Sequence, residues 1–124
     1  MNTAATPATT EDLSACVAAC LAALEQTQAC ANACIRSGDR TLERCALMSL
    51  DCATICQATL NVLLRQSDHH GDFCALCQHI CNACAQECEQ HQHAHCRRCA
   101  AACRDCERAC AVHAGERHAL PGAH

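Results

Sequence analysis

The sequence predicts an all-α protein, an antiparallel up-down-up-down four-helix bundle with a cysteine-lined core. Long stretches are rich in Ala, Leu, Gln and Glu, which are good helix formers. No stretch alternates polar and apolar residues with a period of two, and β-branched residues are sparse, so strands are not expected. The cysteines recur at steps of three and four residues, a spacing that keeps side chains on one face of a helix.

Four helices are expected along the 124 residues, joined by short connections. We place them at about 12–36, 41–66, 72–90 and 95–114, between a flexible N-terminal tail over 1–11 and a C-terminal tail over 115–124. Gly38 is positioned for a left-handed cap after the first helix, and Asp72 for the N-cap of the third. Because short connections favour antiparallel neighbours, one bundle should span residues 12–114.

The composition leaves little material for an ordinary apolar core. The chain has 17 Cys and 26 Ala but one Phe, no Trp and no Tyr, with 20 residues in all among Leu, Ile, Val, Met and Phe. Protein interiors are close-packed by interlocking side chains, so the cysteines must supply much of the packing. Seventeen is an odd number, which excludes complete pairing in intrachain disulfides. We therefore expect free thiols in the core, as in a reducing compartment.

The cysteines form one stripe on each expected helix. The third and fourth helices share the spacing C-x2-C-x3-C-x2-C-x3-C, which is a weak internal repeat. Sulfur is missing from the first stripe at Ala23 and Thr27, and either Met48 or Ser49 fills a gap in the second. In a bundle the striped side is the core. The stripe residues are Cys16, Cys20, Cys30, Cys34, Cys45, Cys52, Cys56, Cys74, Cys77, Cys81, Cys84, Cys88, Cys96, Cys99, Cys103, Cys106 and Cys110.

Rows of thiols on every helix indicate a site for many soft metal ions. Thiolates select Cu(I), which accepts few ligands and lets one sulfur bridge two ions, so the capacity approaches about one ion per cysteine. Bare thiolates would be prohibitive in a core, whereas replacing each thiol proton with a monovalent ion leaves the formal charge unchanged. The sequence therefore predicts storage and detoxification of many Cu(I) ions.

Other metal chemistries remain open at this stage. Structural zinc sites use isolated sets of four ligands. Iron–sulfur clusters also use grouped cysteines, and the CxxC spacing alone does not exclude them. Either alternative would use a subset of the 17 cysteines. A copper chaperone or a copper-responsive regulator is a further alternative; a chaperone needs one exposed site of low capacity.

The repeated spacing and the segment CEQHQHAHCRRCAAACRDCERAC resemble the Csp-type bacterial copper-storage proteins, specifically their cytosolic branch. The resemblance covers about residues 12–114. It implies a four-helix bundle, Cu(I) held mainly by the cysteines from Cys16 to Cys110, and a homotetramer. Ala23 and Thr27 depart from the family pattern, because the stripe expects sulfur there.

Three residues besides the cysteines are candidate copper ligands. His91 and His95 lie at the corner between the third and fourth helices and resemble a histidine pair of the family. Met48 belongs to the same end of an antiparallel bundle, and a thioether is a soft ligand. His113 extends the fourth stripe by one rung at the opposite end. We expect the histidines in loops, in the tail or well off a stripe to be solvated, namely His69, His70, His79, His118 and His124.

The two ends of the expected bundle differ in chemistry. One end gathers metal-binding side chains, namely Cys34, Cys45, Met48, Cys88, His91, His95 and Cys96. The other gathers apolar side chains that would plug it, namely Leu13, Leu60, Leu63, Leu64 and Phe73. Imidazole and thioether hold Cu(I) less firmly than bridging thiolates. We therefore expect copper to enter and leave at the histidine end.

The remaining features argue against several other functions. The chain carries 9 basic and 13 acidic residues, and a net charge of −4 offers no basic surface for nucleic acid or an anionic membrane. No apolar run approaches the roughly 18 residues of a membrane span. The opening MNTAATPATT lacks the features of a secretory signal, which favours the cytoplasm. No catalytic triad, phosphate-binding glycine loop or carboxylate pair stands out, so we do not expect an enzyme.

Overall fold

The computed structural model describes residues 10–116 of the chain. Its elements are α1 (Thr10–Ser37), the short 3-10 helix η2 (Arg40–Leu42), α2 (Glu43–Leu64), α3 (His70–Cys88) and α4 (Ala94–His113). No strand occurs within residues 10–116. The tails expected over 1–11 and 115–124 fall almost entirely outside these residues, although α1 already begins at Thr10.

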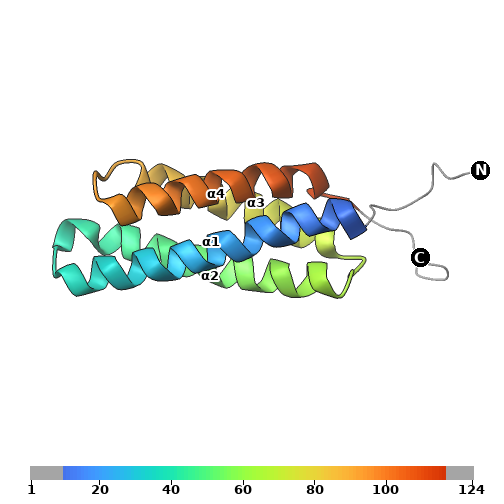
Figure 1. The fold of residues 1–124 in the computed structure, drawn as a ribbon, viewed down its shortest axis with the longest axis horizontal. Coiled ribbons are helices and arrows are strands. Elements are labelled where there is room, and N and C mark those ends of the chain that lie inside the picture. Colours follow the sequence, from blue (N-terminus) through green and yellow to red (C-terminus); the bar gives the residue numbers. More distant parts are fainter. Residues whose placement is uncertain (1–9, 117–124) are drawn as a thin grey trace, which may run out of the picture.

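The four helices lie side by side along one long axis (Figure 1). α1 packs against α2 and α4, and α3 packs against the same two helices, so each helix has two neighbours around the axis. The α1–α2 and α3–α4 connections lie at one end, and the α2–α3 connection lies at the other (Figure 1). This arrangement is the predicted antiparallel up-down-up-down bundle.

The first connection depends on Gly38 and Asp39. Gly38 takes a φ of 69°, in the left-handed region that glycine adopts without steric cost, as predicted. The carboxylate of Asp39 then accepts hydrogen bonds from the backbone N–H and the hydroxyl of Thr41, at 2.9 and 2.7 Å. These bonds cap η2, which leads directly into α2.

α2 ends at Leu64, two residues earlier than expected, in a Schellman motif. Gln66 takes a φ of 52°, and its N–H donates to the carbonyl of Leu63 at 3.1 Å. The N–H of Ser67 donates to the carbonyl of Val62 at 2.9 Å. This pair of bonds satisfies the last carbonyls of the helix and turns the chain away from its axis.

α3 begins at His70, which makes the predicted N-cap at Asp72 wrong. The N–H of Asp72 donates to the carbonyl of His69 at 3.0 Å, so Asp72 lies within the first turn. An acidic residue there still interacts favourably with the positive end of the helix dipole. The same acidic residue therefore stabilises the start of α3 from inside the helix rather than from its cap.

Cysteines make up most of the core. All 17 are free, and none is more than 3% exposed. Leu42 and Leu63 are the largest apolar side chains that are fully buried. Leu13 and Leu60 are buried with Leu63 beyond the last cysteines, and we call this the Leu63 end.

Two members of the expected apolar plug, Leu64 and Phe73, are less buried than the other three. Leu64 is 63% exposed, because it follows the buried Leu63 by one helical step of about 100°. Its assignment to the plug was therefore wrong. Phe73 is half-buried at the first turn of α3. The opposite end of the bundle, where α4 starts near His95, is called the His95 end.

Two helical stretches, Leu13–Ser37 and Arg40–Leu64, are long and apolar enough to cross a membrane by length and composition alone. The expectation that no apolar run approaches the length of a membrane span was wrong when runs are judged by the mean hydropathy of an 18-residue window. The many Ala and Cys residues raise that mean. Both stretches belong to the bundle and turn their cysteine stripes to its core. Core helices of a soluble protein pass the same test.

The two adjacent leucines at the end of α2 provide a matched test of the core. Leu63→Ala should lower the free energy of unfolding of the metal-free protein by about 2–5 kcal/mol, because it leaves a cavity in the plug. Leu64→Ala should change it by less than about 0.5 kcal/mol, since that side chain is mostly in solvent. Urea denaturation under anaerobic, reducing conditions measures both. Equal losses would contradict the placement of Leu63 in the core.

Candidate metal centre

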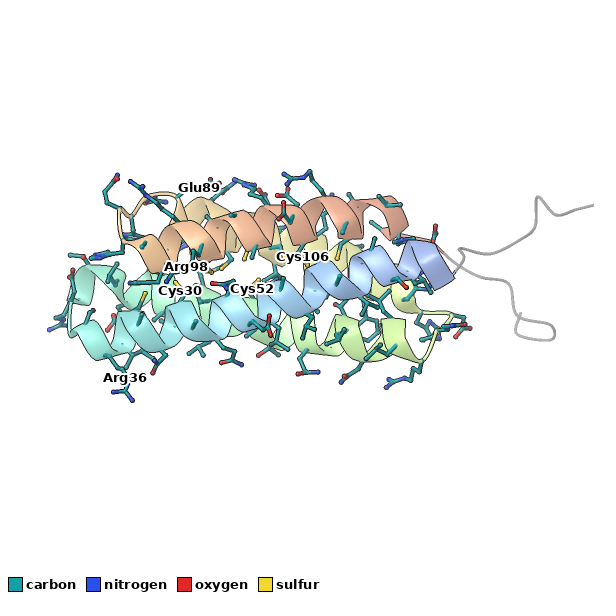
Figure 2. The ribbon with its side chains drawn as sticks, in the orientation of Figure 1. Cys30, Arg36, Cys52, Glu89, Arg98 and Cys106 are labelled. Carbon is teal, nitrogen blue, oxygen red and sulfur yellow. The ribbon has the colours of Figure 1, made fainter. Side chains whose placement is uncertain are left out.

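Helical periodicity carries the cysteines of all four helices to one shared axis. Figure 2 shows the sulfur atoms between the ribbons, with Cys30, Cys52 and Cys106 directed inward. Arg36, on the same helix as Cys30, points away from the bundle (Figure 2). The Arg36 side chain thus stays in water while the thiols face one another.

The sulfur atoms form a column that starts next to the Leu63 end. Cys16 Sγ lies 3.7 Å from Cys110 Sγ, which lies 3.9 Å from Cys106 Sγ. Cys106 Sγ is 3.8 Å from Cys77 Sγ, which is in turn 3.8 Å from Cys81 Sγ. Contributions from α1, α3 and α4 therefore interleave within this half of the column.

The column continues through the middle of the bundle. Cys52 Sγ of α2 lies 3.6 Å from Cys81 Sγ and 3.8 Å from Cys103 Sγ. Cys99 Sγ lies within 4.8 Å of the sulfur atoms of Cys88 and Cys30, which carries the column towards the His95 end. No layer of large apolar side chains separates the two halves among the buried residues described.

At the His95 end the column finishes in a group of thiols and one imidazole. Cys45 Sγ lies 3.6 Å from Cys88 Sγ and 3.9 Å from both Cys96 Sγ and Cys30 Sγ. His95 Nδ1 lies 3.5 Å from the sulfur atoms of Cys30 and Cys96. The structure therefore places His95 next to the sulfur atoms with which the sequence predicted it to bind copper.

Several of the sulfur atoms belong to more than one potential metal-binding group, namely those of Cys30, Cys77, Cys106 and Cys110. In each group the ligand atoms lie within 4.8 Å of one another. Two sulfurs that bind one ion tetrahedrally, each at about 2.3 Å, lie about 3.8 Å apart, which matches the spacing in the column. The groups include Cys16–Cys74–Cys110, Cys20–Cys77–Cys106–Cys110, Cys56–Cys77–Cys81–Cys106, Cys30–Cys88–Cys99 and Cys30–Cys34–His95–Cys96.

Close packing drives the pKa values of the thiols apart. Burial, and then the neighbouring Cys30, raise the pKa of Cys34 to about 12. Hydrogen bonds from Cys52 and Cys81 lower the pKa of Cys103 to about 6. A few thiolates are therefore stabilised by neighbouring S–H donors, while most thiols hold their protons until a metal ion replaces them.

Four buried rungs of the stripes lack sulfur, and they are filled by small residues. Ala23 and Thr27 of α1 are completely buried, as the stripe predicted. Ser49, rather than Met48, fills the gap in α2, with its Oγ 3.9 Å from the sulfur atoms of Cys84 and Cys99. The sequence analysis missed Thr59, which is also fully buried.

Thr59 could have been found from its spacing. It lies three residues after Cys56, at the next rung of the α2 stripe. Its hydroxyl donates to the carbonyl of Phe73 at 3.5 Å. The residue therefore follows the last sulfur of α2 and lies next to Leu60 of the plug.

The other two predicted ligands at the His95 end lie farther out. His91 Nε2 is 2.9 Å from Oε2 of Glu87, and the other carboxylate oxygen, Oε1, accepts a hydrogen bond from Nε of Arg44 at 3.1 Å. Met48 is half-buried and packs against the core without filling a rung of the stripe. The structure therefore brings His95 to the sulfur atoms, whereas His91 and Met48 surround the group.

Two histidines lie buried at the Leu63 end. His70 is 1% exposed where it opens α3, so the expectation that it is solvated was wrong. His113 is buried beyond Cys110, in line with its expected place on the α4 stripe. His69 and His79 are exposed as expected, while His118 and His124 lie outside the described residues.

The chain matches known proteins in sequence and in structure. The family model for copper storage proteins matches residues 9–115. A cysteine-rich protein of Bacillus subtilis (strain 168), YhjQ, is 35% identical over 97 residues, which are 77% of this chain and 90% of the relative.

Two solved structures superpose closely on the bundle. The Cu(I)-bound copper storage protein BsCsp3 has a TM-score of 0.80 and 32% identity, covering 84% of this chain and 99% of that one. Ccsp from Streptomyces lividans, solved after loading with 10 copper equivalents, has a TM-score of 0.77 and 36% identity, covering 86% of this chain and 90% of that one.

The fold and the sulfur column define a metal-binding four-helix bundle of high thiol content. Its long row of shared thiols distinguishes it from bundles that hold one or two ions. With the matches over nearly the whole bundle, the chain belongs to the copper storage protein family.

The two gaps in α1 make a direct test of the column. Ala23→Cys and Thr27→Cys should each raise Cu(I) capacity by about one ion and leave helicity unchanged, because each adds a thiol at a fully buried rung. Ala22→Cys is the matched control, since residue 22 is exposed. Its thiol should react rapidly with a bulky probe in the metal-free protein. Equal reactivity of all three thiols would overturn the assigned stripe.

Proposed function

We propose that this protein stores and detoxifies Cu(I) in the sulfur column between its four helices. The observation that carries the proposal is the sharing of buried thiols between neighbouring groups in both halves of the bundle. A thiolate that bridges two ions serves a chain of Cu(I) ions, which accept low coordination numbers. The membership in the copper storage family and the copper-loaded relatives support the same conclusion.

The charge of the core favours Cu(I) over divalent ions. Seventeen thiols that exchange their protons for monovalent ions keep the core formally neutral. A divalent ion at the same density would leave a large positive charge in a medium of low dielectric constant. Zinc is therefore expected to saturate at far fewer ions per chain.

The sharing of ligands also weakens the alternatives that use a subset of the cysteines. Cys77, Cys106 and Cys110 each belong to two groups. An isolated zinc site or an iron–sulfur cluster would occupy four sulfurs and leave the adjoining thiols without a function. A continuous Cu(I)–thiolate chain uses every sulfur in the column.

We assign the ligand role to all 17 cysteines and to His95, with His91 and Met48 as auxiliary groups. His95 Nδ1 is placed between two sulfur atoms, so an ion bound there would have both thiolate and imidazole ligands. His91 is held by Glu87 at hydrogen-bond distance, next to the same end. Together these groups support the His95 end as the entrance for copper.

An apolar face on α1 and α2 supports assembly into a homo-oligomer, with the homotetramer of the family resemblance as the proposed state. Leu21 and Ile35 of α1 and Leu47 and Leu50 of α2 are exposed. Ile35, Leu47 and Leu50 line a shallow groove between the two helices. Large apolar side chains that are exposed on neighbouring helices are typical of a surface covered by another protein chain.

A cytoplasmic, non-enzymatic role completes the proposal. All 17 cysteines are free, which suits a reducing compartment. Their side chains are shielded from solvent, so substrates have little access to them. The same burial keeps bound Cu(I) away from thiols of other molecules in the cell, with which it would otherwise exchange.

Anaerobic titration with Cu(I) tests the storage function. Binding should saturate at about one ion per cysteine, well above ~10 ions per chain, because bridging lets each thiolate serve two ions. Zn2+ titrated into the same metal-free protein is the control and should saturate much earlier. Copper saturation at one to four ions per chain would contradict storage and favour a chaperone, zinc or cluster site.

Replacement of the two corner histidines tests the entrance. His91→Ala/His95→Ala should slow copper uptake from a chelated donor and change capacity by no more than about two ions, since the sulfur column remains. His95→Ala should account for most of the effect, because His95 contacts the sulfur atoms. His79→Ala, at an exposed site on α3, is the control. Unchanged rates in the double variant, with faster exchange in Leu63→Ala, would place the entrance at the Leu63 end.

A further inference from the structure

Two buried histidines and a glutamate form a cluster at the Leu63 end, beyond the last sulfur atoms. His70 begins α3 and His113 ends α4, and they are 1% and 3% exposed. His70 Nε2 and His113 Nδ1 both lie near Oε1 of Glu116, at 2.9 and 3.1 Å. The two rings meet edge to face, with their centroids 5.9 Å apart.

The hydrogen bonds of His70 determine which of its nitrogens carries a lone pair. Nδ1 lies 2.9 Å from the carbonyl oxygen of Ser67, which can only accept, so Nδ1–H is the donor. In a neutral imidazole, Nε2 is then an acceptor that faces a second acceptor, Oε1 of Glu116, at 2.9 Å. Either a proton or a metal ion must lie between these two atoms.

The surroundings fit a metal ion in that position. A metal-binding histidine usually donates its other ring N–H to a backbone carbonyl or a carboxylate, as His70 does to Ser67. Burial raises the pKa of Glu116, but the neighbouring imidazoles of His70 and His113 outweigh it and hold the pKa below its usual value. The carboxyl group is therefore ionised at neutral pH, and its 36% exposure gives an ion a path from solvent.

Backbone contacts position Glu116 over the two rings. Gly115 takes a φ of 79°, and its N–H donates to the carbonyl of Gly71 at 2.9 Å. A Cβ atom at Gly71 would collide with the backbone of Glu116. Gly71 therefore allows the chain beyond α4 to lie against the start of α3.

We propose that His70, His113 and Glu116 form a binding site for one divalent cation of the Zn2+ type, separate from the sulfur column. Two imidazoles and a carboxylate are ligands that Zn2+ accepts, whereas Cu(I) prefers the thiolates nearby. The ion replaces the proton between His70 and Glu116 and joins α3, α4 and the residues that follow α4. This site would seal the end of the bundle opposite the His95 end.

The test uses the full chain after anaerobic loading with Cu(I), so that the thiols are occupied. Co2+ is added as a spectroscopic substitute for Zn2+, and the copper content is counted before and after. One Co2+ per chain should bind, with visible ligand-field absorption and without the intense thiolate-to-cobalt band of sulfur coordination. Zn2+ should displace it, and calorimetry should give one Zn2+ per chain. The copper count beforehand separates a failure of storage from a failure of this site.

Variants assign the bound ion to the cluster. His70→Ala and Glu116→Gln should each weaken binding of Co2+ and Zn2+ by more than about tenfold. Gly71→Ala should do the same without altering a ligand, because it displaces Glu116. His69→Ala is the matched control, since His69 is the exposed neighbour of His70 and should bind as the unaltered protein does. Copper capacity should remain the same in all four variants.

Three results would overturn the proposal. The first is the absence of Co2+ and Zn2+ binding to the copper-loaded protein while nitrogen NMR finds His70 protonated on both ring nitrogens, which would mean that a proton alone lies between His70 and Glu116. The second is a cobalt spectrum of sulfur coordination. The third is equal affinity in His70→Ala, Glu116→Gln and His69→Ala.

Discussion

The burial of seventeen thiols around one axis constrains every part of this bundle. A protonated thiol packs as a small hydrophobe, and the same side chain becomes a ligand when a metal ion replaces its proton. The core can therefore be filled with or without metal, provided that the replacement leaves its charge near zero. This requirement favours a monovalent soft ion, short side chains in the core and closely packed helices.

The rungs that lack sulfur fit the same constraint. Ala23, Thr27, Ser49 and Thr59 are all fully buried and similar to Cys in size, so they keep the packing and add no charge. The hydroxyl of Thr27 is satisfied within its own helix, where it donates to the carbonyl of Leu24 at 3.1 Å. As a result α1 contributes its sulfur atoms in two separate pairs, and the other three helices supply the middle of the column.

The two ends of the column differ in the side chains that lie beyond the last thiols. At one end His95 reaches the sulfur atoms directly, and a half-exposed imidazole can exchange an ion with a donor. At the other end Leu60, Leu63, His70 and His113 are all buried beyond the last thiols. A single store thus has one end suited to transfer and one suited to retention.

The four helices, the cysteine stripes and the soft-metal chemistry could all be predicted from the sequence, because helical periodicity and thiolate chemistry depend on local spacing and residue type. Which of Met48 and Ser49 fills the missing rung of the α2 stripe could be seen only in the folded bundle. The two side chains are about 100° apart around the helix, and the packing of α2 against its neighbours buries Ser49. It also separated His95 from His91, because the first meets Cys thiols from distant parts of the chain. The sequence placed His70 in a loop next to the exposed His69. The structure buries it against Glu116, which lies 46 residues later in the chain. Such contacts arise from the docking of whole helices, and no short-range pattern records them.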